Sequence, residues 1–231
     1  MGFHRKNIKY FEEITEFLGY KTFQGMRLCQ LGDSYVRRDA KQYLSEIKNL
    51  DYTKLGRASD YYRKLEIEVI TIDLGIGPEN VRSDVLKYDL NKPLENLEGF
   101  DFVVDLGTGE HVEDQFELFR NIHNLCKVNG IIIRCNPSIR WGSPHGFYYY
   151  TFLFYQKLAH SYDYKILDIS EGSGKYGPKM RGLSWKHCIF VTLRKNQDNE
   201  FLRTEWDPVG AEIGKCSIEN CEKLKVKKVF R

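Results

Sequence analysis

The chain has 231 residues, of which 42% are hydrophobic and 29% are charged, and its formal net charge is +3. This composition predicts a globular chain with one sizeable core and excludes extended disorder, and a net charge of +3 is too small to indicate nucleic-acid binding by itself. The longest apolar stretches, residues 100–106 and 131–133, are far shorter than the roughly 20 residues that a membrane-spanning helix needs.

The first half of the chain alternates between helical and strand-like patterns. Apolar residues recur at helical spacing over residues 8–18, which predicts an amphipathic helix laid against the domain. Strands are expected at residues 26–31, 68–72, 85–88 and 102–104. Two further helices, over residues 39–50 and 60–65, are expected between the first two of these strands.

The second half continues the alternation. Apolar positions three or four apart predict a helix over residues 112–126, and Asn129-Gly130 is expected to separate it from a strand at residues 131–134. Thr151 is expected to cap a helix that reaches about Ser161. The aromatic residues of that helix that we expect to pack inward are Phe152, Phe154 and Tyr155. The last two strands, residues 165–169 and 188–193, are expected to form an antiparallel hairpin at one edge of the sheet.

Together these elements predict a three-layer α/β domain with a doubly wound, mostly parallel sheet of seven strands. Residues 1–25 would form an N-terminal helix packed on the domain, residues 26–195 the domain itself, and residues 196–231 a charged, irregular extension. The extension ends in a basic tail, which we interpret first as a solvated terminus.

The cysteines indicate a reducing environment. The six cysteines form no CxxC pair and four lie in apolar contexts, so reduced thiols are expected. Cys216 and Cys221 have four residues between them, but no second pair and no suitably spaced histidines accompany them, so no metal site is predicted. The N-terminal segment MGFHRKNIKYFEE carries charges where a signal peptide has its apolar region, so the sequence favours the cytoplasm.

Polar residues follow the carboxyl ends of the predicted strands, where open parallel sheets bind their ligands. An acid after the second strand, here Asp73, can accept from both hydroxyls of a ribose. An acid after the third strand, here Asp89, can accept from an adenine amino group. Asp84 is the rival for that contact, but it precedes its strand and so belongs to the opposite edge of the sheet.

The segments RLCQLGDS, EVITIDL, VLKYDLNKPL, FDFVVDLGTGEHV and NLCKVNGIIIRCNP resemble those of the class I S-adenosylmethionine-dependent methyltransferases over about residues 26–193. The motifs DLNKPL, GTGEHV and HGFYYYTFLFY are similar to those of a small group from bacteria, phages and large viruses, often tied to glycan modification. The resemblance implies S-adenosylmethionine as methyl donor and a sugar hydroxyl as acceptor. The cofactor contacts that it implies are Gln30, Leu31, Gly32, Asp33, Ser34, Asp73, Leu74, Asp89, Leu90, Asp105, Gly107 and Thr108.

The first loop departs from the family pattern of an acid followed by glycine, any residue and glycine. Gln30 replaces the acid, and Asp33, Ser34 and Tyr35 stand where further glycines are usual. Glycines let backbone amides crowd a pyrophosphate, and S-adenosylmethionine has no phosphate. The loop therefore disfavours a dinucleotide, and we expect the amino-acid end and the sulfonium to meet the Gln30 and Asp33 side chains and the Gly32 backbone.

The stretch GTGEH, residues 107–111, supplies the candidate catalytic residues. His111 can titrate near neutrality and so could take the proton of an acceptor hydroxyl, while Glu110 orients the imidazole or holds the acceptor. His145 is the second candidate base. The alternative interpretation is that Thr108 or Glu110 caps the helix that follows.

The loop at residues 136–150 is polar, aromatic and rich in glycine, which is typical of a substrate-binding loop. Trp141, Tyr148 and Arg140 are the expected acceptor contacts, because aromatic faces stack on the C–H surfaces of sugars. The alternative is that the aromatic residues fill the core.

Two other functions remain open from the sequence. A non-catalytic partner subunit of the same fold would explain the unusual first loop. A nucleic-acid methyltransferase is favoured by the basic tail and by Arg37, Arg38 and Arg140, and its binding would weaken steeply with salt.

Overall fold

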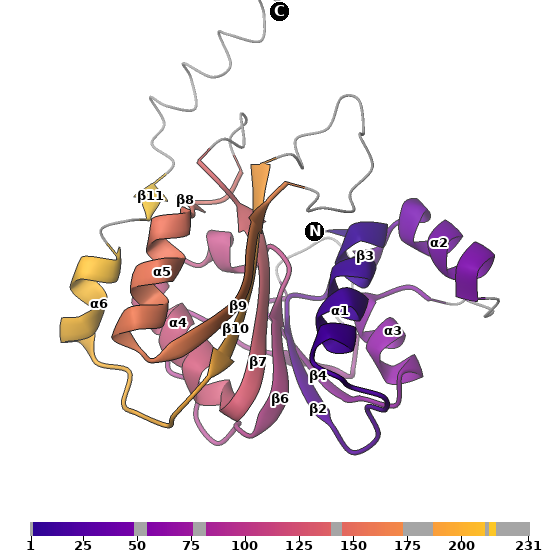
Figure 1. Cartoon of the computed structure of the whole chain (residues 1–231), viewed down its shortest axis with the longest axis horizontal. Helices are drawn as coiled ribbons and strands as arrows, with labels where there is room; N and C mark the ends of the chain where they lie inside the picture. Colours follow the sequence, from indigo (N-terminus) through magenta and orange to yellow (C-terminus); the bar gives the residue numbers. More distant parts are fainter. Residues whose placement is uncertain are drawn as a thin grey trace, which may run out of the picture.

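The computed structural model describes residues 2–48, 55–75, 82–139, 145–172, 187–210 and 213–215. Its centre is a seven-stranded sheet, which confirms the predicted α/β class (Figure 1). The strands lie in the order β5 (Val85–Lys87), β4 (Glu68–Asp73), β2 (Arg27–Leu31), β6 (Phe100–Asp105), β7 (Cys126–Pro137), β10 (Cys188–Lys195) and β9 (Tyr164–Glu171).

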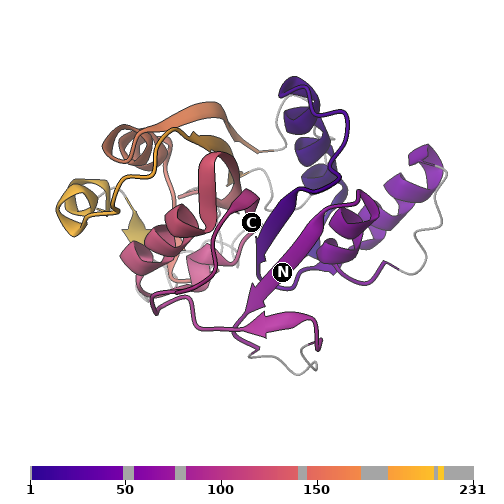
Figure 2. The ribbon, with the colours of Figure 1, turned by 90° about the horizontal axis from the view of Figure 1, so that it is seen from below.

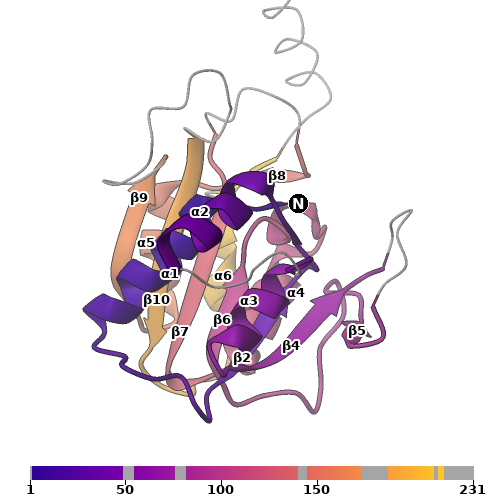
Figure 3. The same ribbon diagram turned by 90° about the vertical axis from the view of Figure 1, so that its right-hand side faces the viewer.

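The first five strands of this order are parallel, and β10 runs antiparallel to both of its neighbours, β7 and β9. The expected antiparallel pair is therefore present at one edge, with β9 outermost. Figure 3 shows β9 and β5 at opposite edges of the twisted sheet. Strand order reverses between β2 and β6, because the chain adds β4 and β5 on one side and returns to add β6 and β7 on the other.

Helices cover both faces of the sheet, as Figure 2 shows from below. One face carries α1 (Arg5–Phe17), α2 (Arg38–Lys48) and α3 (Ala58–Lys64), and the other carries α4 (Gln115–Leu125), α5 (Phe152–Ser161) and α6 (Arg203–Gly210). Among the residues that the structure describes, every helix is too short or too polar to cross a bilayer.

The N-terminal helix α1 packs on the domain as its apolar spacing predicts. Ile8, Phe11 and Ile14 are buried on its inner face. Tyr10 donates a hydrogen bond to Asp168 at 2.8 Å and lies 2.9 Å from Thr192 Oγ1, so polar contacts also hold α1 against β9 and β10.

One helix start differs from the sequence-based expectation, and another agrees. Asp114, not Thr108 or Glu110, caps α4, because its carboxylate accepts a hydrogen bond from the Glu117 amide at 3.0 Å. Residues 109–111 form a separate 3₁₀ turn, η1 (Gly109–His111). Thr151 caps α5 as predicted, with its hydroxyl 3.0 Å from the Phe154 amide.

The aromatic residues of α5 do not all face inward. Phe154 and Tyr155 are fully buried, but Phe152 is 40% exposed, so the prediction for Phe152 is wrong. The physical reason is the helical period, since Phe152 lies two residues before Phe154 and so falls on a different face.

The segment after Asn196 is more ordered than its charged composition suggests. Helix α6 contributes Trp206 and Val209 to the core against α4 and α5, and Phe201 stacks on Tyr162 with ring centroids 3.7 Å apart. Two short pairings complete the structure, β1 (Gly2–Phe3) with β3 (Tyr35–Val36) and β8 (Tyr148–Tyr149) with β11 (Gly214–Lys215).

Candidate functional site

The carboxyl ends of β2, β4, β5 and β6 gather at one edge of the sheet, next to the point where strand order reverses. Asp73 is the last residue of β4 and pairs in register with Lys87 of β5, and Asp89 lies two residues beyond Lys87. The two predicted acids therefore lie at the same edge of the sheet on neighbouring strands. This is the arrangement that one nucleoside-binding site would require.

Asp73 is held rigidly beside the first loop. Its Oδ2 accepts a hydrogen bond from the Asp33 amide at 2.9 Å, and its Oδ1 accepts from the Gly75 amide at 2.7 Å. Each carboxylate oxygen has about two lone-pair directions, so both oxygens retain capacity to accept from a ligand hydroxyl. The Asp73 carboxylate thus links β2 and β4 and remains half-buried at the edge.

Gln30 and Asp33 present buried acceptors at the end of β2. Gln30 Nε2 donates to the Gly32 carbonyl at 2.6 Å, while Gln30 Oε1 is buried and accepts nothing from the part of the chain that the structure describes. Asp33 Oδ2 lies 3.2 Å from Arg57 Nε, and its buried Oδ1 likewise accepts no hydrogen bond within the described ranges. Burial raises the pKa of the Asp33 carboxyl, and the positive charge of Arg57 opposes that rise.

Two features explain why residue 32 is glycine, a positive φ and a close contact with Thr108. Its φ is +82°, and an added Cβ would overlap the Thr108 hydroxyl, which donates to the Leu31 carbonyl at 2.9 Å. The Gly32 amide donates to Ile72 at 2.7 Å, and its carbonyl accepts from Gln30. The Gly32 backbone therefore serves contacts inside the protein, and the close approach that needs glycine is made by Thr108.

Other predicted cofactor contacts lie in varied surroundings. The side chains of Leu31 and Leu90 are buried in the core. Ser34 is also buried, and Leu74 is 40% exposed. Gly107 has a φ of +94°, which places a tight turn immediately before Thr108.

Asp89 forms a local turn as well as lying at the predicted edge. Its Oδ1 accepts from the Asn91 amide at 3.0 Å and from Asn91 Nδ2 at 2.8 Å, and these bonds lower the pKa of the carboxyl. Its rival Asp84 is engaged elsewhere, because its Oδ2 lies 2.7 Å from Arg82 and 2.8 Å from Arg63.

Asp105 is not placed to contact a cofactor. Its Oδ1 accepts from the Thr108 and Gly109 amides at 2.9 and 3.1 Å. Its Oδ2 accepts from Arg134 at 2.7 Å and from Asn136 at 3.2 Å, and the side chain is 1% exposed. We therefore assign Asp105 to holding the loop at residues 106–109.

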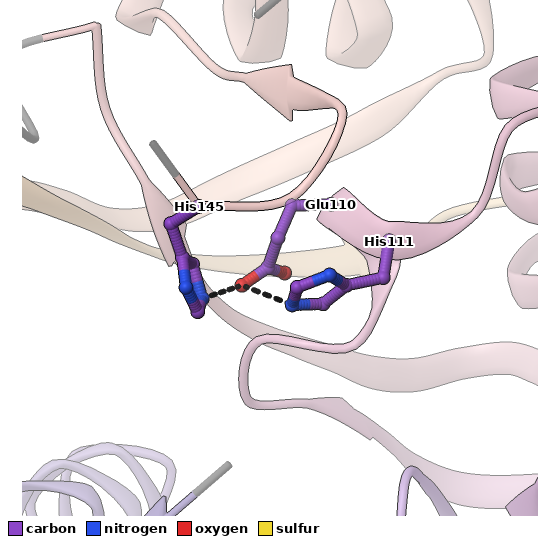
Figure 4. A group of neighbouring side chains, drawn as sticks. All are labelled: Glu110, His111 and His145. Carbon is purple, nitrogen blue, oxygen red and sulfur yellow. Dashed lines mark ion pairs between the residues drawn. The ribbon is translucent and has the colours of Figure 1, made fainter. Parts of the chain in front are cut away.

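Glu110, His111 and His145 converge although Glu110 and His145 are 35 positions apart along the chain (Figure 4). Glu110 Oε1 lies 3.4 Å from His145 Nε2 and 3.9 Å from His111 Nε2, and the two imidazole centroids are 4.9 Å apart. Glu110 is 1% exposed, whereas the side chains of His111 and His145 are 47% and 34% exposed. Burial lowers the pKa of His111, and the Glu110 carboxylate opposes that shift.

The backbone holds the two halves of this cluster together. The Phe147 amide donates to the Glu110 carbonyl at 2.7 Å, and Gly146, with a φ of +72°, leaves room for Glu110 that a Cβ would fill. The Glu110 carboxylate also accepts from Asn136 Nδ2 at 2.9 Å. Glu110 is thus fixed from β7 on one side and from the loop before β8 on the other.

The expected acceptor contacts are only partly described. Arg140 and Trp141 lie outside the described residues. Tyr148 donates from its hydroxyl to the Glu113 carbonyl at 2.7 Å, so this hydroxyl is used within the protein. Tyr148 also borders a cavity of about 510 Å³ whose other lining residues include Asp114, Phe116, Arg203 and Trp206.

Sequence reasoning missed the polar network that supports the cluster. Arg134 is fully buried and lies over the rings of Phe119 and Tyr150, and Asn136 connects Asp105 to Glu110. An arginine inside the apolar run IIIRC was the available signal, because a buried guanidinium requires a buried acid as partner.

Comparisons with solved structures identify the fold, whereas comparisons with family models and curated proteins find no match. No family model matches the sequence, and no curated protein matches it either. Many solved structures share the fold, and all those below are described as methyltransferases. A putative S-adenosylmethionine-dependent methyltransferase from Listeria monocytogenes is 10% identical over 81% of this chain and 96% of that one, with a TM-score of 0.52.

Two more solved structures show the same likeness. A putative sarcosine dimethylglycine methyltransferase from Galdieria sulphuraria is 14% identical over 83% of this chain and 84% of that one, with a TM-score of 0.52. The N-methyltransferase NodS from Bradyrhizobium japonicum, in complex with S-adenosylhomocysteine, is 12% identical over 84% and 89% of the two chains, with a TM-score of 0.50. The chain has the Rossmann-like fold of these methyltransferases.

Proposed function

We propose that this chain is an S-adenosylmethionine-dependent methyltransferase that binds its cofactor at the carboxyl ends of β2, β4 and β5. The observation that carries the proposal is the position of Asp73, rigidly held at the tip of β4 beside the first loop. The likeness to solved methyltransferases, one of them in complex with S-adenosylhomocysteine, supports S-adenosylmethionine as the cofactor.

The residues at this edge fit a cofactor that is cationic and carries no phosphate. Gln30 Oε1 and Asp33 Oδ1 are buried acceptors without a donor in the described part of the chain, and Asp73 adds a carboxylate. An ammonium, a sulfonium or a ribose hydroxyl would satisfy such acceptors, whereas a pyrophosphate would be repelled. Asp89 is the proposed contact of the adenine amino group.

S-adenosylmethionine supplies a methyl group on a positively charged sulfur when it is bound. The chain must then hold an acceptor and remove its proton. We assign this task to the cluster of Glu110, His111 and His145, which the buried contacts of Glu110 keep fixed.

We propose a sugar hydroxyl as the acceptor. A carboxylate and two imidazoles are suited to a hydroxyl because they accept its hydrogen bond or its proton. Phe147 is 49% exposed next to Glu110 and offers an aromatic surface for stacking. Trp141, Arg140 and Tyr148 are the further proposed contacts of the glycan.

Calorimetry with S-adenosylhomocysteine tests the cofactor, and transfer of a labelled methyl group to a panel of sugars and glycans tests the acceptor. We expect saturable binding of one nucleoside per chain. Absence of binding at about 1 mM ligand, which corresponds to a binding free energy weaker than about −4 kcal/mol, would contradict the proposal and favour a non-catalytic subunit. Labelling of nucleic acid in place of sugars would identify a different acceptor.

A further inference from the structure

We propose that Glu110, His111 and His145 form a binding site for one divalent transition-metal ion. One oxygen and two nitrogens, Glu110 Oε1 and the Nε2 atoms of both histidines, would be the ligands (Figure 4). Binding of the ion stands on this geometry alone, while its role in catalysis rests on the proposed function.

The first argument is the state of the Glu110 carboxylate. The side chain is almost fully buried, and its Oε2 accepts from Asn136 Nδ2. Its Oε1 is buried and has no hydrogen-bond donor among the described residues, although two imidazole nitrogens face it. Buried carboxylate oxygens are nearly always hydrogen-bonded or bound to a metal, and a cation placed between this oxygen and the two imidazole nitrogens would satisfy it.

The second argument is the spacing of the three atoms. All three lie within 4.8 Å of one another, and Glu110 Oε1 is 3.4 Å and 3.9 Å from the two nitrogens. Zinc binds nitrogen and oxygen at about 2.0–2.2 Å, so two ligands at a tetrahedral angle lie about 3.4 Å apart. The cluster is therefore within a small side-chain movement of coordination distance.

The third argument is the chemistry and exposure of the ligands. Two imidazoles and one carboxylate suit zinc, cobalt or iron better than magnesium or calcium, which prefer oxygen ligands. Glu110 is buried while the histidines are partly exposed, so an ion has a route from solvent. Three protein ligands leave a coordination position for a further oxygen, which is typical of catalytic sites.

The site is also pre-organised around Glu110. Asn136 orients the carboxylate from β7, and it is itself bonded to Asp105. The Phe147 amide bonds the Glu110 carbonyl two residues after His145, so the loop that carries His145 is anchored to η1. Second contacts of this kind raise the affinity of metal sites because they fix the ligands in place.

The inference deepens the proposed function and changes how the cluster would act. Glu110 Oε1 and the two Nε2 atoms cannot take the acceptor's proton while they bind a metal ion, so the ion takes over the activation of the acceptor. A metal ion lowers the pKa of an oxygen bound to it, so an acceptor hydroxyl in the open position would lose its proton to solvent more easily. The sequence predicted no metal site. The cysteine pair was the one candidate considered and was rejected, and the spacing of Glu110 and His145 along the chain matches no metal-binding motif.

Metal titration of the untagged 231-residue chain tests the proposal. After treatment with a chelator and dialysis, Co²⁺ is added and its visible absorption followed, and Zn²⁺ is titrated by calorimetry. We expect one ion per chain. His111→Ala and His145→Ala should each weaken metal binding at least about 10-fold. Loss of a residue that only supports a ligand already weakens metal binding by about 10-fold or more, and these two residues are proposed as ligands themselves.

Controls separate this site from other ligands on the chain. His160→Ala removes an exposed histidine of α5 and should leave binding unchanged, as should Cys216→Ser combined with Cys221→Ser. Because His111 and His145 are partly exposed, their variants should keep the melting temperature of the parent. Glu110→Gln keeps the shape of the side chain and should also weaken binding.

Failure of this proposal and failure of the proposed function give different results. No bound ion, or equal affinity in the parent and both histidine variants, overturns the metal site even if S-adenosylhomocysteine binds. Metal binding that depends on both histidines supports the site even if calorimetry detects no S-adenosylhomocysteine, in which case only the catalytic role is lost.

Discussion

The guanidinium of Arg134 lies against the carboxylate of Asp105, with Nε and Nη2 at 2.9 and 2.7 Å from Oδ2. Neither side chain is more than 1% exposed. The pair connects the middle of the sheet to the candidate site, because Asp105 holds the Thr108 and Gly109 amides and Asn136 links it to Glu110.

Removing one charge of this pair should destabilise the fold strongly. Asp105→Asn leaves the Arg134 charge buried without a partner, so we expect the free energy of unfolding to fall by about 3–5 kcal/mol. Glu68→Gln is the matched control, because it also converts a carboxylate to an amide in an ion pair, here with Arg27 on the surface at 3.4 Å. It should cost at most about 1 kcal/mol. Urea denaturation measures the free energy of unfolding of both variants. Equal losses in Asp105→Asn and Glu68→Gln would show that burial of the Asp105–Arg134 pair does not determine its contribution to stability.

The fold could be predicted because apolar residues repeat with the period of each element. Residues 8–18 and 112–126 carry one apolar face, and the helices α1 and α4 lie within two or three residues of these ranges. Strand ends were predicted less well, since β7 begins at Cys126, where the sequence suggested that a helix ended. Cys126 pairs with Phe100 of β6, and the next pair is Ile131 with Phe102, so the register shifts across the polar residues 127–130. Apolar spacing carries no information about such an irregularity.

The candidate site was predicted in part, for a related reason. The positions of Asp73 and Asp89 could be predicted because they depend only on where a strand ends, and their contacts with a cofactor stay a prediction. The overlap between Gly32 and Thr108 and the approach of His145 to Glu110 depend on how distant loops pack. Such contacts leave no periodic pattern in the sequence, so the sequence did not reveal that Thr108 packs against Gly32 or that His145 lies beside Glu110.

The packing of Thr108 on Gly32 can be measured directly. Gly32→Ala and Gly25→Ala place a Cβ at nearly the same positive φ, +82° and +78°, but only the Cβ at position 32 meets a neighbour. Both should lose about 1–2 kcal/mol from the left-handed conformation. Gly32→Ala should lose about 1–3 kcal/mol more from overpacking.

Thermal or urea unfolding gives both values. Thr108→Ala should recover part of the extra loss when it is combined with Gly32→Ala, because it removes the hydroxyl that the new methyl group would overlap. If the two glycine variants are equally unstable, the packing of Thr108 is not what requires glycine at position 32.

His123 should make the fold sensitive to acid. Burial, followed by the charge of Lys195, lowers its pKa to about 4. Its ring nitrogens lie 2.5 Å from the Tyr164 hydroxyl and 2.8 Å from the Asn199 carbonyl, contacts that suit a neutral imidazole. The unfolded chain binds a proton at about pH 6.5, so stability present above that pH is lost as the pH falls towards about 4.

The loss attributable to His123 should be at most about 3 kcal/mol between these pH values. His123→Gln should flatten this part of the dependence of unfolding free energy on pH, while His160→Gln, at an exposed position of α5, should leave it as in the parent. Carboxylates also contribute below pH 5, so the difference between variant and parent is the informative quantity. Identical curves for the parent and His123→Gln would contradict the assignment.

The proposed ribose contact is tested by acids at the two ends of one strand. Asp73 is the last residue of β4 and lies at the candidate site. Glu68 is the first residue of the same strand and lies at the opposite end of that strand. Asp73→Ala should weaken binding of S-adenosylhomocysteine by about 1–3 kcal/mol, since it removes a charged acceptor of hydrogen bonds. Glu68→Ala should bind as the parent does. Calorimetry measures the affinities, and melting temperatures confirm that both variants fold. Unchanged affinity in folded Asp73→Ala would place the ribose elsewhere, because no ligand hydroxyl could then depend on that carboxylate.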